Sequence, residues 1–294
     1  VKSTVSLSKM TGQYFATIEG ESGKIDINDL ASPSKVIAEA TRTQIDQIFA
    51  GRVESDEDFA EKFRGFDFNR VVNNITDWID QDKTSLNGGE ESSNYQDLDP
   101  DMFPPNTPFK TIEELHMVEG MTDEIYEMIT PRLTVYGTKG VNVNYAAKDV
   151  LMSLSPQITD IRADEVIKRI KDPQQGPFKD ETDFVGFLNS QGVNGNPFRE
   201  GDIVKVPLLF DSEMNFRVRS TGRSGRVQRD ITVIVFDFDR VKVRLQEFLA
   251  QQDKTKGGDG EEPPVPTPTP ATPPKKAPVP APKDPPNIVY WNET

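Results

Sequence analysis

The chain of 294 residues contains no cysteine and a single histidine, His116. Disulfide bonds, thiol nucleophiles and zinc sites built from Cys and His are therefore excluded. A Ser-His-Asp triad would need His116, but no G-x-S-x-G nucleophile elbow accompanies it. The pattern favours a histidine on the surface of a helix, and the sequence gives no constellation that predicts an enzyme.

Long hydrophobic runs are also missing. No apolar stretch reaches the roughly 18 residues that a membrane-spanning helix needs. The chain starts at Val1, without a methionine or a signal-peptide pattern. This start is expected either for a cytosolic protein or for one whose N-terminus has been removed.

Basic residues are fewer than acidic ones, 34 against 48, which gives a formal net charge of −14. An acidic protein repels phosphate backbones, so no nucleic-acid partner is expected. One short basic cluster stands out, and its period-two portion predicts the solvent-facing side of a strand. The cluster consists of Arg217, Arg219, Arg223, Arg226 and Arg229.

Strand-like segments lie near both ends of the chain. Residues 14–18 and 24–28 alternate in polarity around a Gly-containing turn, which predicts a hairpin or a bent strand. Residues 203–210, 216–220 and 231–236 alternate in the same way, and residues 221–225 have the composition of a hairpin turn. These patterns predict a mainly antiparallel sheet built from both ends of the chain.

Helical patterns fill the middle of the chain. Ser32-Pro33 predicts a helix start, and Gly51 is placed to end that helix. A second helix is predicted at residues 70–82. Short helices with brief connectors follow, starting near Thr111, Thr122, Tyr145, Asp164 and Asp180.

A proline-rich segment, 263–286, holds 12 of the 23 prolines and predicts an extended flexible loop. The strand-like residues Val289, Tyr290 and Trp291 follow it. We expect this end of the chain to rejoin the sheet.

Several segments, in order along the chain, resemble the K-type minor pseudopilins of the type II secretion system (general secretion pathway protein K). They are residues 21–30, 77–82, 88–91 with Tyr95, 106–109, 113–120, 133–137, 141–147 and 289–291. The resemblance covers roughly residues 14 to 170 and the C-terminal end.

The resemblance implies an α+β fold, with a pilin-like antiparallel sheet unit and a large inserted all-helical domain of helix-hairpin-helix or SAM-like type. We assign residues 1–30 and 199–294 to the sheet unit and residues 31–198 to the insert, because chain ends often meet in one unit around an inserted domain. The N-terminal hydrophobic helix of the family is absent from this sequence, which indicates a trimmed soluble fragment.

The family also implies a non-enzymatic role in protein export. Its members lie at the tip of the periplasmic pseudopilus and, when full length, are anchored in the bacterial inner membrane by the N-terminal helix. The implied partners are the I- and J-type minor pseudopilins, and secreted substrates are further candidates. Nucleic acid is not among them.

Two other functions compete with this one. Residues 141–147, 167–170 and 176–178 resemble the helix-hairpin-helix repeats of DNA-uptake proteins. Such hairpins present glycine amides to phosphate, whereas residues 155–160 contain no glycine. Paired acids could also hydrolyse glycosides, but no aromatic sugar-binding cleft is indicated.

The acidic loop after the second predicted helix indicates a structural calcium site. Asp80 and Asp82 leave the helix end, and Glu90 and Glu91 return after two glycines. Together with Asp77 these acids would repel one another without a cation, and calcium prefers six to eight oxygen ligands. The predicted ligands are Asp80, Asp82, Glu90 and Glu91; the resemblance adds that related proteins bind calcium in acidic loops.

Overall fold

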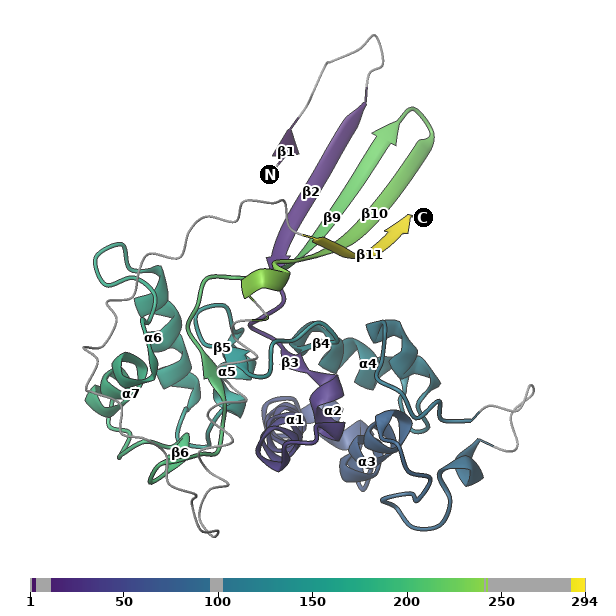
Figure 1. Cartoon of the computed structure of the whole chain (residues 1–294), viewed down its shortest axis with the longest axis horizontal. Helices are drawn as coiled ribbons and strands as arrows, with labels where there is room; N and C mark the ends of the chain where they lie inside the picture. Colours follow the sequence, from purple (N-terminus) through teal and green to yellow (C-terminus); the bar gives the residue numbers. More distant parts are fainter. Residues whose placement is uncertain (1, 4–11, 96–102, 241, 243–286, 294) are drawn as a thin grey trace, which may run out of the picture. The chain divides into compact units, whose positions relative to one another are not determined.

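The computed structural model describes five stretches of the chain, residues 2–3, 12–95, 103–240, 242 and 287–293. They divide into two compact units. The sheet unit comprises residues 1–19 and 214–294, and the helical unit comprises residues 20–213. The chain enters the helical unit after strand β2 (Gln13–Gly20) and returns to the sheet at β9 (Asn215–Ser224), so the helical unit is inserted between two strands of one sheet (Figure 1).

The sheet unit contains a five-stranded sheet in the order β1-β2-β9-β10-β11. Strand β1 (Lys2–Ser3) pairs antiparallel with β2, β10 (Val227–Phe236) pairs antiparallel with β9, and β11 (Asn287–Glu293) pairs antiparallel with β10. Within β10, the β-branched residues Val233 and Ile234 are buried, as expected for a strand with neighbours on both sides.

The C-terminal strand β11 returns to the sheet as the sequence predicts. Trp291 lies opposite Val233, and Tyr290 lies opposite Ile234. The expectation that residues 289–291 rejoin the sheet is therefore confirmed. The predicted proline-rich loop, 263–286, lies outside the described residues.

The helical unit consists mainly of short helices. Its α-helices are α1 (Lys35–Ser55), α2 (Glu57–Lys62), α3 (Phe68–Ile79), α4 (Asp123–Ile129), α5 (Lys148–Ser153), α6 (Asp160–Lys171) and α7 (Glu181–Ser190). Its 3-10 helices are η1 (Ile27–Ala31), η2 (Glu91–Asn94), η3 (Ile112–Met117) and η4 (Thr130–Arg132). None of the described helices is both long and apolar enough to cross a membrane.

Side-chain caps begin several of these helices. Asp180 accepts a hydrogen bond from the Asp183 main-chain N–H (2.9 Å) at the start of α7, and Thr111 forms a capping box with Glu114 at η3. Helix α1, in contrast, does not end at Gly51 as predicted. Glycine within a helix costs only about 1 kcal/mol, and the helix continues to Ser55.

The insert is not purely helical, which corrects the prediction of an all-helical domain. Three pairs of two-residue strands stabilise its connectors. They are β3 (Ile25–Asp26) with β4 (Leu133–Thr134), β5 (Val141–Asn142) with β8 (Leu208–Leu209), and β6 (Arg199–Glu200) with β7 (Ile203–Val204). Because β3 pairs with β4 and not with β2, residues 14–18 and 24–28 do not form a hairpin, which was one of the two predicted arrangements.

The boundaries of the insert also differ from the predicted ones at 30/31 and 198/199. The structure places them at 19/20 and 213/214. Ile25 and Ile27 before the helices, and Phe198 and Leu208 after them, are buried in the hydrophobic core of the helical unit. Their packing assigns both flanking segments to the insert.

Candidate metal centre

The end of α3 brings two carboxylates to the edge of the helical core. Asp67 caps the start of the helix by accepting a hydrogen bond from the Arg70 main-chain N–H (3.2 Å). The apolar face of the helix is buried and includes Val72 and Ile75. Asp77 and Asp80 are three residues apart at the other end, and this spacing places both side chains on the same side of the helix.

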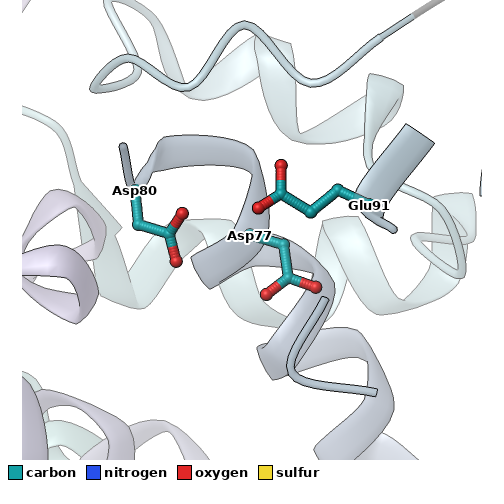
Figure 2. A group of neighbouring side chains, drawn as sticks. All are labelled: Asp77, Asp80 and Glu91. Atoms are coloured by element: carbon teal, nitrogen blue, oxygen red, sulfur yellow. The ribbon is translucent and has the colours of Figure 1, made fainter. Parts of the chain in front are cut away.

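Glu91, the first residue of η2, completes a group of three acids at this point (Figure 2). One carboxylate oxygen from each of Asp77, Asp80 and Glu91 lies within 4.8 Å of the other two. Asp77 and Glu91 are each only 3% exposed. Asp80 Oδ1 and Glu91 Oε1 are buried and have no hydrogen-bond partner among the residues that the structure describes. Buried oxygens of this kind are costly unless a positive group faces them.

Burial and mutual repulsion disfavour the charged forms of these acids. Burial, with added repulsion from Asp80, Asp77 and Asp82, raises the pKa of Glu91 to about 7, against a hydrogen bond from Asn106 that lowers it. Burial also raises the pKa of Asp80, and the charges of Asp82 and Asp77 raise it further. A cation among the three carboxylates would reverse both effects.

Asp77 fixes the start of the acidic loop. Its carboxylate accepts hydrogen bonds from Ser85 Oγ (2.8 Å) and from the Leu86 main-chain N–H (3.1 and 3.2 Å). Burial raises the pKa of Asp77, whereas these hydrogen bonds lower it. The loop that carries Glu91 is therefore attached to the helix that carries Asp77 and Asp80.

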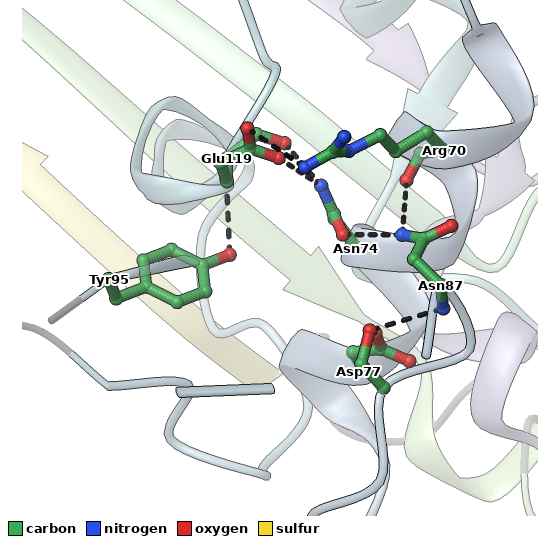
Figure 3. Close-up of polar contacts among 7 residues, drawn as sticks. Arg70, Asn74, Asp77, Asn87, Tyr95 and Glu119 are labelled. Carbon is green, nitrogen blue, oxygen red and sulfur yellow. Dashed lines mark hydrogen bonds and ion pairs between the residues drawn. The ribbon is translucent and has the colours of Figure 1, made fainter. Parts of the chain in front are cut away.

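A network of polar side chains holds the loop from the other side (Figure 3). Asn87 donates hydrogen bonds to Asn74 Oδ1 (2.8 Å) and to the Arg70 carbonyl oxygen (3.2 Å). The buried Asn74 donates to the main-chain oxygen of Glu119 (2.9 Å), and the Glu119 main-chain N–H donates to Tyr95 Oη (3.1 Å). This network joins α3, the acidic loop and the segment after η3.

Asn106 approaches the acids from a distant part of the sequence. Its Nδ2 donates to Glu91 Oε2 (3.2 Å) and to the Asp82 carbonyl oxygen. Asn106 has a φ of 50°, a left-handed conformation that Asn and Gly tolerate better than other residues. Asn106 thereby holds one oxygen of Glu91 and leaves Oε1 for another ligand.

The structure brings together two of the four predicted ligands. Asp80 and Glu91 belong to the group, whereas Asp82 and Glu90 are exposed and lie outside it. The Asp82 carboxylate instead accepts a hydrogen bond from the Thr84 main-chain N–H (2.7 Å). Asp77 is not among the predicted ligands, because the sequence indicates only that its charge repels the neighbouring acids. Its i, i+3 spacing to Asp80 is the sequence signal for a shared site.

The three acids fit a hard cation. They offer only oxygen, and their oxygens lie within 4.8 Å of one another, no farther apart than about twice a Ca–O distance of 2.3–2.6 Å. Carboxylate oxygens of Asp80 and Glu91 without hydrogen-bond partners are available to it. Asp77, Asp80 and Glu91 are therefore the residues that could hold calcium.

The segment that carries this site matches a known family model. Residues 23–138 match the family model for type II secretion system (T2SS), protein K. This segment is therefore similar to the protein K family of the type II secretion system. It contains all three acids of the site and Asn106.

Two further comparisons concern proteins of the type II secretion system. Type II secretion system protein K of Klebsiella pneumoniae is 28% identical over 100 residues, which cover 32% of this chain and 31% of that protein. The chain thus spans about a third of this curated relative. A chain in the crystal structure of the GspK-GspI-GspJ complex from the type 2 secretion system of enterotoxigenic Escherichia coli has a similar fold. The two folds superpose with a TM-score of 0.51 and 15% sequence identity, and the match covers 80% of this chain and 78% of that chain. The predicted α+β class with an antiparallel sheet is confirmed.

Proposed function

We propose that the chain is a K-type minor pseudopilin of the type II secretion machinery and acts as a structural subunit, not as an enzyme. The observation that carries this proposal is the likeness of the fold, over 80% of the chain, to a chain of the GspK-GspI-GspJ complex. The match of residues 23–138 to the protein K family model supports it independently, because that match comes from the sequence alone.

In this role the chain joins the I- and J-type minor pseudopilins in a heteromeric tip of the periplasmic pseudopilus. The full-length protein is anchored in the inner membrane. A large unit inserted between β2 and β9 supports a terminal position, because such a bulky insert would be difficult to stack repeatedly along a thin filament. The proposed activity is assembly of the pseudopilus and export of proteins, with secreted substrates as further contacts at the tip.

Co-purification tests this role. A tagged form of the chain is expressed with its cognate I- and J-type pseudopilins, and the eluate is examined by size-exclusion chromatography. We expect all three proteins in one peak. Separate elution of the three folded proteins would contradict the proposal.

We also propose that Asp77, Asp80 and Glu91 hold a structural calcium ion. The support comes from buried carboxylate oxygens without partners on Asp80 and Glu91 and from the raised pKa values of all three acids. When bound, the ion would supply the positive charge that this group lacks. Asp77 and Asn106 would then fix the acidic loop on α3 and stabilise the helical unit.

A further inference from the structure

The hairpin formed by β9 and β10 carries the arginine cluster of the sequence. Ser224 pairs with Val227, so Gly225 and Arg226 form a two-residue turn. Gly225 has a φ of 60°, as the first central position of a type II′ turn requires. The turn therefore lies at the C-terminal end of the predicted segment 221–225, and the rest of that segment extends strand β9.

The outer part of the hairpin extends past its neighbour β11. Pairing between β10 and β11 runs from Phe236 to Ile231 and stops there. Residues 223–229 are all exposed, including the apolar tip residue Val227, which is 61% exposed. The tip of the hairpin is thus an accessible protrusion on this side of the sheet.

Arginines surround this tip on both faces. Directly opposed residues of an antiparallel pair share one face of a sheet. Arg223 lies opposite Gln228, and Arg229 lies opposite Gly222. Because Gly222 and Arg223 are neighbours in one strand, Arg223 and Arg229 are on opposite faces. Arg226 occupies the turn between them.

The charge of Arg223 acts on one acid in the part of the chain that the structure describes: hydrogen bonds from Gln228 and Thr221 lower the pKa of Asp230, and Arg223 lowers it further. No ion pair is formed there by Arg223, Arg226 or Arg229, and Arg223 Nε donates instead to Gln228 Oε1 (2.7 Å). The one acid of the hairpin sequence, Asp230, accepts hydrogen bonds from Gln228 Nε2 (2.8 Å) and Thr221 Oγ1. The hydrogen bonds to its carboxylate come from neutral groups. Among the described residues, Arg223 donates through Nε alone, and the guanidinium groups of Arg226 and Arg229 donate no hydrogen bond.

The charge of the tip contrasts with that of the helical unit. Residues 20–213 carry 19 basic and 37 acidic side chains, a net charge of −18, whereas the remaining residues carry 15 and 11, a net charge of +4. Salt limits the reach of exposed charges to about 8 Å under physiological conditions. Residues 223–229 themselves contain three arginines and no acid, so a partner that contacts the tip meets positive charge.

The choice of arginine indicates the chemistry of the partner. The hairpin strands and their turn contain five arginines and no lysine, although the whole chain has 19 lysines and 15 arginines. Arginine is enriched and lysine depleted in protein interfaces. Its planar fork binds carboxylates in a bidentate manner. Attraction to an anionic membrane surface, in contrast, makes little distinction between the two residues.

We propose that the tip of the β9–β10 hairpin docks into an acidic cleft on a partner pseudopilin. Arg223 and Arg229 would pair with carboxylates on opposite walls of that cleft, and Arg226 with carboxylates at its base. The cationic tip, with arginines on both faces, suits a cleft better than a flat surface. The inference rests on the proposed function, because the partner is a subunit of the same assembly.

The test measures the association rate of the whole chain with the purified pair of I- and J-type pseudopilins, at low and at high salt. The variant combines Arg223→Gln, Arg226→Gln and Arg229→Gln. A control with the same change in charge combines Arg64→Gln, Lys110→Gln and Lys171→Gln, which are exposed residues of the helical unit.

We expect the hairpin variant to associate about tenfold more slowly at low salt and to lose most of its salt dependence, whereas the control keeps the rate of the unchanged chain. Thermal melting checks that both variants fold. The salt dependence of the unchanged chain is a second measurement: an association rate that salt does not affect would refute docking by this tip.

Failure of the inference differs from failure of the proposed function. If the unchanged chain does not associate with the pair, the proposed function and the docking both fall. If it associates and the hairpin variant does so equally well, only the docking is refuted. Vesicles containing phosphatidylglycerol provide the remaining comparison. If only the unchanged chain binds them, and the variant still associates normally with the pair, the tip contacts lipid and the proposal is wrong.

Discussion

Replacing Glu91 by glutamine tests the proposed metal centre. The substitution should lower the stability of the folded chain in the presence of calcium but not in its absence. The substitution keeps the shape of a side chain that is 3% exposed but removes its negative charge. Without calcium, it removes repulsion with Asp80 and Asp77, so the variant should be at least as stable as the unchanged chain. With calcium, it removes a ligand and should lose most of the stabilisation.

The size of the effect follows from ligand binding to the folded state. At a calcium concentration of about 100 times Kd, binding stabilises a protein by about 2.7 kcal/mol. For a domain of this size, 1 kcal/mol shifts the melting temperature by about 2–4 °C, so calcium should raise it by about 5–10 °C. In the Glu91→Gln variant we expect less than about half of this rise, since calcium ligation depends on carboxylate charge.

The assay is differential scanning calorimetry with excess calcium and with chelator, combined with calorimetric titration of the ion. Glu90→Gln is the matched control, because Glu90 is adjacent, exposed and outside the group of three acids. It should keep the full response to calcium. An equal calcium response in both variants would refute the assignment of Glu91, and no response in the unchanged chain would refute the site.

Three further predictions concern the same unit. Asn106→Gly preserves the left-handed backbone but removes the amide that holds Glu91, and should weaken calcium binding about 10- to 100-fold in a titration. Burial raises the pKa of Glu91 from 4.5 to about 7. In the ion-free protein, the stability that comes from protonated Glu91 is therefore fully present below pH 4.5, the ordinary pKa, and is lost as the pH rises through about 7, the pKa in the folded protein. Calcium needs the ionised form, so the rise in melting temperature with calcium should grow from about pH 5.5 to about pH 7.5. Gly137→Ala would place a Cβ 2.4 Å from Asp26 Cβ and should destabilise the unit by about 1–3 kcal/mol in denaturant unfolding, whereas Gly51→Ala, which meets nothing within 4 Å, should stabilise it slightly.

Local sequence patterns predicted the elements that depend on local signals. The periodic apolar residues of 70–82 correspond to α3, and Asp180 caps α7 as expected. Strand β11 was predicted because an aromatic, β-branched segment follows the proline-rich one. The predicted end of α1 at Gly51 was wrong, because a favourable helix on both sides outweighs the cost of one glycine.

Features that depend on distant contacts were not predictable in the same way. Strand β3 pairs with β4, more than a hundred residues later, and no local pattern in either two-residue strand specifies this partner. At the proposed metal centre, the acidic loop and the resemblance led to Asp80 and Glu91 as ligands, and calcium binding by them stays a prediction. The contribution of Asn106 was not predicted, because its contact with Glu91 exists only in the folded chain.

The most direct test of the proposed role is sedimentation velocity of the chain mixed with its I- and J-type pseudopilins, with each protein also run alone. The account predicts a single faster species that contains one copy of each protein, formed at the expense of the three separate ones. If the chain sediments at the same rate with and without the folded pair, it does not join such an assembly, and the proposal that it is a K-type minor pseudopilin is contradicted.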